Sequence, residues 1–290
     1  WPQYVRVGHS GETEEEIQHV INKYRAVVSM CDHYLGQVLD RMDQYDLWKD
    51  TMLIVNTDHG FLLTEHNWWG KVREPIYDEL AHTPFFLWDP RSGVRNEHRG
   101  ALCQTIDIAP TLLDFFNVPI PQDMQGKPLR DTVASDKPVR EYALFGMHGF
   151  HVNVTDGRYV YMHTPVREHL DDLYDYMQTP TSYPNSVTLD KLRQGQMCWD
   201  FHFTKGTPLL RLPGHCMGMI PNDPETLYAP DGLYGEGNLL FDLEQDPKQL
   251  QPLHDEAVES RMIKAMKQLM EENEAPAEQY VRLGLSYENA

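Results

Sequence analysis

The first 138 residues alternate between helical patterns and short apolar runs. Between residues 13 and 48, apolar positions recur at helical spacing after a capping-box pattern at Thr13 and Glu16, which predicts one long helix. The apolar, partly β-branched run 52–55 is typical of a strand covered on both faces in a mostly parallel sheet. Three further elements are expected: a short helix near 74–80, a buried strand at 84–88 and an amphipathic helix at 105–117, with Pro110 in its first turn. A long helix followed by a buried strand indicates an α/β unit.

After residue 138 the period of the pattern changes. Short alternating segments flank Asp156-Gly157, a strong hairpin signal, so an antiparallel sheet is expected. Residues 165–237 are rich in Pro, Gly, Tyr and Asp and have weak periodicity, which predicts a long irregular insertion. Three elements close the chain: a strand in "NLLFDLEQDP", a helix over 253–273 with Val258, Met262, Met266 and Met270 on one side, and a tail. We therefore predict two domains, 1–138 and 139–290.

Composition narrows the class of protein. The chain has 290 residues, 41% of them hydrophobic, which suffices for a sizeable core. A formal net charge of −19 without a Lys/Arg stripe disfavours binding to nucleic acid or anionic lipid. No apolar run has the length of a transmembrane segment. Because the chain begins at Trp1 without a signal-peptide pattern, we expect that a leader or a longer N-terminal part has been removed, and the compartment is not predicted.

The four cysteines do not form a metal-binding or redox motif. Cys31, Cys103, Cys198 and Cys216 lie too far apart for a zinc finger or a C-x-x-C pair. Cys31 and Cys103 are expected to be buried thiols on helix faces.

Charged residues gather directly after the run 52–55. The charged and titratable residues between positions 58 and 71 are Asp58, His59, Glu65, His66 and Lys71. Ligands bind α/β sheets beyond the carboxyl ends of the strands, and an adjacent carboxylate and imidazole reach one cation if the backbone turns sharply, as Gly60 would allow. The tripeptide alone leaves two interpretations open, a metal site and a solvated loop with a capping Asp.

The surrounding residues carry a family resemblance. "DHGFLLTEHNWWGK" resembles the segment after a core strand in sulfatases of the alkaline phosphatase superfamily, usually written S/T-D-H/N-G-x-x-x-G-E/D-H-G-x-W-x-K. The residues at family positions are Asp58, His59, Gly60, Glu65, His66, Trp69 and Lys71. The Asp-His pair is most similar to iduronate-sulfatase-like and choline-sulfatase-like members. Thr64 and Asn67 each replace a common Gly.

The resemblance extends over 17–138 and 238–253. The long helix has the family's Asp-x-x-x-Gly pattern at Asp32 and Gly36, and "DELAHTPFFLWDPR", "QTIDIAPTLLDFFNVPIPQDMQGKPL" and "LLFDLEQDPKQLQPL" are similar to later family segments. The implied fold is α/β: the C-terminal part of an alkaline-phosphatase-like mixed sheet flanked by helices, plus a smaller antiparallel-sheet subdomain with a C-terminal helix. In this scheme residues 1–138 are the C-terminal portion of the catalytic domain.

The resemblance also implies a site. Asp58 and His59 would hold one divalent cation together with two acidic residues from the N-terminal half. Ca²⁺ is the expected cation, and Mn²⁺ is the alternative. Lys71 would face a sulfate or phosphate oxygen as a catalytic residue, the alternative being an exposed surface lysine. His66 would assist the substrate oxygen or support the loop. In two-metal members of the superfamily, a His-Thr segment at the place of His82 donates a ligand to a second metal. A structural role is favoured for His82 in this chain.

The family's nucleophile is absent from this sequence. Sulfatases oxidise Cys or Ser in C/S-x-P/A-x-R to formylglycine, and no such motif occurs here. The chain therefore resembles the C-terminal half of a sulfatase that hydrolyses small-molecule or sugar sulfate esters, with the nucleophile on an N-terminal half of the same enzyme, and alone it is expected to be inactive. Two alternatives stay open: a phosphodiesterase or phosphonate monoester hydrolase of the same superfamily, and a non-catalytic fragment that binds a partner or glycan through 165–237. The aromatic residues between 159 and 203 would line a sugar or aryl pocket or form the core of that insertion.

Overall fold

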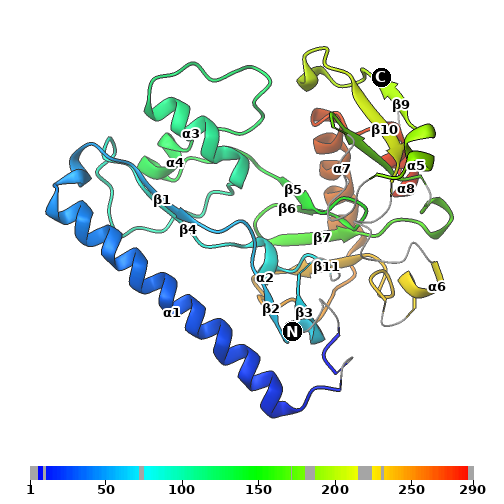
Figure 1. The fold of residues 1–290 in the computed structure, drawn as a ribbon, viewed down its shortest axis with the longest axis horizontal. Coiled ribbons are helices and arrows are strands. Elements are labelled where there is room, and N and C mark those ends of the chain that lie inside the picture. Colours follow the sequence, from blue (N-terminus) through cyan, green and yellow to red (C-terminus); the bar gives the residue numbers. More distant parts are fainter. Residues whose placement is uncertain are drawn as a thin grey trace. The chain divides into compact units, whose positions relative to one another are not determined.

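The chain divides into two compact units, each described here by itself (Figure 1). Unit 1 comprises Trp1–Pro119 and Gly126–Glu141, and unit 2 comprises Ile120–Gln125 and Tyr142–Ala290. The computed structural model describes residues 6–8, 11–71, 75–170, 172–179, 187–214, 224–229 and 232–286. Among these, no helix has both the length and the apolarity needed to cross a membrane. The assignment of 1–138 and 139–290 to two functional domains stays a prediction.

The long helix of unit 1 is α1, Glu14–Gln44. Its predicted capping box is confirmed, since the Thr13 side chain accepts from the Glu16 backbone and Glu16 Oε2 accepts from Thr13 N at 2.9 Å. Its apolar face is largely open within this chain, with half-exposed Val27, Val28, Met30, Tyr34 and Val38. Cys31 lies on this helix and is exposed, so the prediction of a buried thiol was wrong there, because no element of the described chain covers that face. Cys103 is partly buried, and burial raises the pKa of its thiol.

The predicted apolar strands of unit 1 form, but their pairing differs from the expectation. Strand β1, Leu53–Asn56, pairs antiparallel with β4, Phe85–Trp88, in a two-stranded sheet. Most of their side chains are only partly buried, and Phe86 is 66% exposed. The prediction of a parallel, doubly covered strand was therefore wrong for this chain, in which β1 has β4 as its strand neighbour.

The remaining elements of unit 1 are short. They are η1 (Leu47–Lys49), β2 (Leu62–Leu63), η2 (Glu65–Asn67), β3 (Trp69–Gly70), α2 (Asp78–Ala81), η3 (Thr105–Asp107), α3 (Ile108–Phe115) and α4 (Arg130–Ser135). Strands β2 and β3 pair antiparallel. The predicted helix at 105–117 is confirmed as η3 followed by α3, with Pro110 in the first turn. Fully buried Asp107 accepts from Lys127 N at 2.8 Å and pairs with Arg140 at 2.5 Å, which ties the segment 126–141 to α3.

Unit 2 contains a four-stranded antiparallel sheet in the order β11-β7-β6-β5. The strands are β5 (Ala143–Gly146), β6 (Val152–Thr155), β7 (Tyr159–His163) and β11 (Leu239–Asp242). The predicted hairpin joins β6 to β7, with Thr155 opposite Val160 and Gly157 at a φ of 91° in the turn. Antiparallel pairing and hairpin thus follow the local sequence signals.

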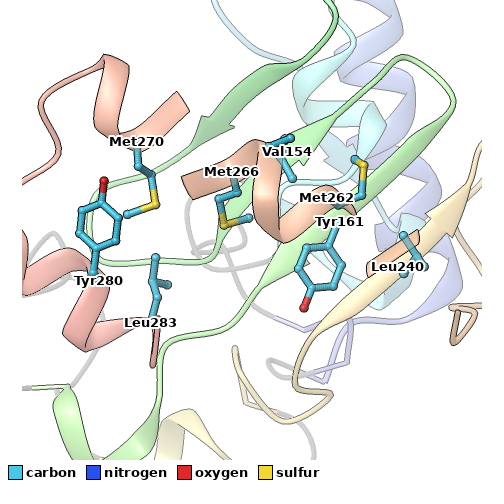
Figure 2. Packing of buried hydrophobic residues seen from close by; sticks show 9 residues of the cluster. Val154, Tyr161, Leu240, Met262, Met266, Met270, Tyr280 and Leu283 are labelled. Carbon is cyan, nitrogen blue, oxygen red and sulfur yellow. The ribbon is translucent and has the colours of Figure 1, made fainter. Parts of the chain in front are cut away.

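One face of this sheet packs against α7, Glu256–Glu272 (Figure 2). Met262, Met266 and Met270 are at most 2% exposed, which confirms the predicted apolar side of the helix. The prediction of a C-terminal tail was wrong: α8, Ala277–Arg282, follows, and Tyr280 and Leu283 lie in the same core. Burial of apolar surface is therefore nearly complete in this part of unit 2.

A second, three-stranded antiparallel sheet lies within 165–237, which corrects the prediction of an irregular insertion. Its order is β8-β10-β9, and the elements of the region are η4 (Arg167–His169), β8 (Tyr174–Met177), α5 (Leu189–Arg193), β9 (Gln196–Cys198), η5 (His202–Thr204), β10 (Leu209–Pro213) and α6 (Pro224–Leu227). Tyr161 belongs to the main core of unit 2, whereas Tyr176 and Phe201 pack in this second sheet and Trp199 is 60% exposed. Tyr183 and Cys216 lie outside the described residues.

Gly60 packs directly onto the backbone of α2. Its N–H donates to Leu80 O at 2.9 Å, and a Cβ at this position would lie 1.6 Å from Glu79 O. Gly60 is not among the residues with positive φ. The sequence argument for a Gly at this turn therefore holds for a different reason, namely close approach of two backbones rather than left-handed geometry.

We predict that Gly60→Ala destabilises the protein by about 1–3 kcal/mol, because the backbone at Glu79 must move to admit the methyl group. Urea denaturation measures the change. Gly100→Ala is the matched control, since its nearest neighbour would be an ordinary contact at 3.6 Å with Asp136. Equal stability losses in the two variants would contradict the close-packing account.

His151 is a buried titratable group at the start of β6. Its side chain is 1% exposed and meets the Tyr234 ring edge-on, with 5.3 Å between ring centroids. Burial lowers the pKa of His151 to about 3, and the nearby positive charge of Arg282 adds to the effect. The folded protein therefore keeps this imidazole neutral at a pH where the unfolded chain binds a proton.

Because the folded pKa is depressed, the unfolding free energy should fall as the pH drops from about 6.5 towards about 3, by up to about 1.4 kcal/mol per pH unit from this group. His151→Phe should reduce that slope in denaturation curves measured across this range. The same substitution at exposed His98 is the control. An unchanged slope in His151→Phe would show that the buried imidazole does not control acid stability.

Candidate functional site

The site begins where β1 ends. The Asp58 side chain is 81% exposed, and its Oδ1 accepts from His59 N at 3.0 Å and from Thr57 Oγ1 at 3.3 Å. Desolvation raises the pKa of this carboxyl, but the neighbouring His59 and these hydrogen bonds outweigh it and hold the pKa below its usual range. Asp58 is therefore an ionised carboxylate presented to solvent.

The His59 ring is oriented by its own turn. Because Nδ1 lies 2.8 Å from Gly60 O and a carbonyl oxygen can only accept, Nδ1 carries the proton and donates. Nε2 of the neutral ring then has a free electron pair. It lies 3.3 Å from Asp58 Oδ2 and forms a hydrogen bond with Lys71 Nζ. Three of the four predicted site residues, Asp58, His59 and Lys71, thus lie together. The Lys71 ammonium contacts His59 Nε2, the atom through which His59 would bind a metal.

This donor set fits half of a metal site. The imidazole nitrogen, in the tautomer that a metal needs, lies beside the Asp58 carboxylate on one side and contacts a cationic group, the Lys71 ammonium, on the other. Within the described ranges, no group of three or more His, Cys, Asp or Glu side chains is arranged to hold a metal ion. Asp58 and His59 would therefore contribute two ligands, and further ligands would be needed.

The fourth predicted site residue, His66, lies apart from this cluster. Its ring stacks on Tyr77 at 3.6 Å between centroids and 5° between planes, and its Nε2 lies 3.1 Å from Glu79 Oε2. The side chain is only 6% exposed. This environment favours support of the loop, while the catalytic role of His66 stays a prediction.

Glu79 and Tyr77 were not identified from the sequence. Glu79 lies in α2 and Tyr77 is the N-cap of that helix, thirteen and eleven positions beyond His66, and neither forms a recognisable spacing pattern with it. The acidic "YDEL" stretch before His82 was the one sequence feature that could have indicated these partners of His66. It is equally typical of the first turn of a helix.

The turn between these groups has left-handed backbone at non-glycine residues. Thr64 has a φ of 93° and Asn67 a φ of 62°, and these are the two positions where the family commonly has Gly. His66 between them also has a positive φ, of 53°. Left-handed geometry costs a β-branched residue of order 1–3 kcal/mol, so the turn at Thr64 is strained. Thr64 and Asn67 therefore adopt backbone conformations that glycine adopts at no steric cost.

His82 lies outside the cluster. It is 82% exposed, and its Nδ1 lies 3.2 Å from Asp78 Oδ2, a hydrogen bond that raises the pKa of the ring. His82 thus pairs with Asp78, one helical turn away on α2.

Comparisons with known proteins agree with this architecture. The family model described as sulfatase matches residues 2–118, and the model described as N-sulphoglucosamine sulphohydrolase, C-terminal, matches residues 64–197. Among curated relatives, an arylsulfatase of Clostridium perfringens is 29% identical over 130 residues, covering 44% of this chain and 27% of the relative. An N-acetylglucosamine-6-O-sulfatase of Bacteroides thetaiotaomicron is 32% identical over 124 residues, covering 43% and 21%.

Solved structures share the fold. A protein in complex with its substrate D-glucosamine-2-N,6-O-disulfate matches with a TM-score of 0.59 at 15% identity, covering 90% of this chain and 42% of the other. The phosphonate monoester hydrolase of Silicibacter pomeroyi matches with a TM-score of 0.55 at 19% identity, covering 90% and 42%. These likenesses establish a mixed α/β fold like that of alkaline phosphatase.

The chain aligns with only part of each relative. The matched segments span about a quarter of the length of the curated relatives, 21–28% in the first of them. The two family models overlap and together match residues 2–197. The chain is therefore similar to sulfatases over the larger part of its length.

Proposed function

We propose that this chain is part of a metal-dependent sulfatase that hydrolyses sulfate esters, with a formylglycine nucleophile supplied by an N-terminal half that is not in this chain. The observation that carries the proposal is that Asp58 and His59 lie directly after β1 and that His59 Nε2 contacts both the Asp58 carboxylate and the Lys71 ammonium. The curated relatives are arylsulfatases and a sugar O-sulfatase by name, which supports sulfate-ester chemistry.

Asp58 and His59 are the proposed cation ligands. With two acidic residues of the N-terminal half they would give oxygen-rich coordination with one imidazole, which suits Ca²⁺, with Mn²⁺ as the alternative at an Asp-His pair. When bound, the cation would supply a positive charge that polarises the sulfate oxygens. The Gly60 carbonyl holds the His59 ring in the tautomer that leaves Nε2 available.

Lys71 is the proposed substrate-facing residue. Its ammonium lies in the same cluster as both cation ligands, so it shares their position at the carboxyl end of β1. Sulfate-ester cleavage places growing negative charge on the leaving oxygen, and a fixed ammonium stabilises that charge in the transition state. His66, held by Glu79 and Tyr77, would keep the loop between these residues in place.

A sugar sulfate ester is the proposed substrate class. One relative is named for N-acetylglucosamine 6-O-sulfate, and one fold neighbour was solved with a disulfated glucosamine. A phosphonate monoester hydrolase shares the fold, so phosphonate or phosphodiester chemistry is the alternative. In the complete enzyme, comparing kcat/KM for an aryl sulfate and the matching aryl phenylphosphonate decides between them, since the sulfatase proposal requires the sulfate ester to be preferred.

We predict that Asp58→Asn and His59→Ala each weaken cation binding in the complete enzyme by more than about tenfold, because loss of even an outer-shell partner costs about 10–100-fold. Metal content after dialysis, together with a Ca²⁺ titration, measures this. Asp50→Asn, at the opposite end of β1, is the matched control and should keep its metal. Full metal content in both site variants would remove Asp58 and His59 from the ligand set.

Lys71→Ala is predicted to lower kcat by about 10²–10³ while the metal content stays unchanged, because one positioned charge in the transition state is lost. Lys49→Ala, an exposed lysine of unit 1, controls for the loss of surface charge. If Lys71→Ala loses metal as Asp58→Asn does, the proposed division between ligands and substrate-facing lysine is wrong.

A further inference from the structure

An open groove lies in unit 2, outside the Asp58 cluster. It has a volume of about 520 Å³, within the usual range of about 300–1,000 Å³ for small-molecule sites. Its walls come from β8 and the residue after it, η5, the start of β10 and the connection between α7 and α8. The residues that line it are Tyr176, Met177, Gln178, Phe201, Phe203, Thr204, Leu209, Asn273, Glu274, Ala275 and Pro276.

The groove has an aromatic wall with a fixed base and an exposed edge. Phe201 is 8% exposed and meets Tyr176 edge-on, with 5.1 Å between centroids. The Tyr176 hydroxyl donates to Glu278, which holds this ring in place. Phe203 lies 5.2 Å from Phe201 and is 48% exposed. A large apolar ring is therefore presented to solvent on a rigid support.

Polar groups surround this aromatic wall. Gln178 is exposed, and its side-chain amide has no hydrogen-bond partner within the described residues. Asn273 Nδ2 donates to Leu269 O at 2.6 Å, which leaves its carbonyl oxygen as an acceptor. Glu274 Oε2 accepts from His202 N at 2.6 Å, so this carboxylate is held in position. The rim thus offers one exposed amide and two acceptors held in position.

The charge of the groove excludes sulfated and phosphorylated ligands. Among the described residues that line it, none is Lys or Arg, and Glu274 brings a negative charge. Lys205, next to η5, pairs with Asp123 at 3.0 Å. Glu274 Oε1 lies 3.3 Å from His202 Nδ1. Anionic ligands would meet this carboxylate and no Lys or Arg among the described lining residues, whereas uncharged hydroxyl and amide groups would find hydrogen-bond partners.

We infer that this groove binds an uncharged pyranose ring of an oligosaccharide, with one sugar face on Phe203 and its hydroxyl or acetamido groups on Gln178, Asn273 and Glu274. Sugar rings combine an apolar face with a hydroxyl edge, which matches an aromatic wall beside a polar rim. An apolar peptide would bury these three polar side chains without partners, at a cost in desolvation. The inference does not rest on the proposed sulfatase activity.

The test is binding of chitotriose, an uncharged trimer of N-acetylglucosamine, to the full chain. A ligand-observed NMR titration measures the affinity. Wild type should bind, and Phe203→Ala and Gln178→Ala should each weaken binding by about tenfold or more. Trp199→Ala is the matched control, because Trp199 is 60% exposed but does not line the groove. Circular dichroism verifies that each variant is folded.

Three results would overturn the inference. They are absence of chitotriose binding to the wild type, equal weakening in Trp199→Ala, and preference for a sulfated heparin tetrasaccharide over chitotriose. Uptake of an apolar dye without any sugar binding would indicate a protein-docking groove instead. Since the measurement involves no turnover, an inactive sulfatase site would leave a positive result intact.

Discussion

The candidate site depends on one close backbone contact, between Gly60 and the Glu79–Leu80 segment of α2. The hydrogen bond from Gly60 N to Leu80 O fixes the turn that carries Asp58 and His59. The same short helix supplies Glu79 to His66, so both ends of the charged segment are held by a single element. This double attachment explains how the strained backbone at Thr64 persists between them.

The two units differ in how they are stabilised. Unit 2 encloses its methionine-rich helix face almost completely, and hydrophobic burial stabilises it. Unit 1 leaves the apolar face of α1 and much of β1 and β4 open within this chain. Unit 1 is stabilised more by polar interactions, such as the buried Asp107–Arg140 ion pair and the backbone hydrogen bond of Gly60. Loss of such a buried partner costs about 3–5 kcal/mol, which is large beside the total stability of a domain.

Local signals in the sequence predicted local structure well. The capping box of α1, the hairpin between β6 and β7 and the methionine side of α7 each depend on residues close together in the chain. Pairing between distant strands was not predictable in the same way: the antiparallel β1–β4 sheet and the β8-β10-β9 sheet depend on long-range contacts. Helix α8 was missed because it is short and begins directly after Pro276.

The site shows the same division. Asp58, His59 and Lys71 could be named from their motif, and the structure brings them together. The role of Gly60 and the contact of His66 with Glu79 could not be derived, since both depend on where α2 docks. Thr64 and Asn67 stood out as departures from the motif, but only the backbone shows that they adopt left-handed geometry.

The central claim is that Asp58 and His59 together hold a divalent cation. The most direct measurement is an anomalous-scattering map from crystals of the complete protein soaked in Mn²⁺. The account predicts a peak within bonding distance of an Asp58 carboxylate oxygen and of His59 Nε2, with Lys71 Nζ displaced from that nitrogen. A well-ordered map with Mn²⁺ bound by other residues, and the Lys71 ammonium still on His59, would contradict it.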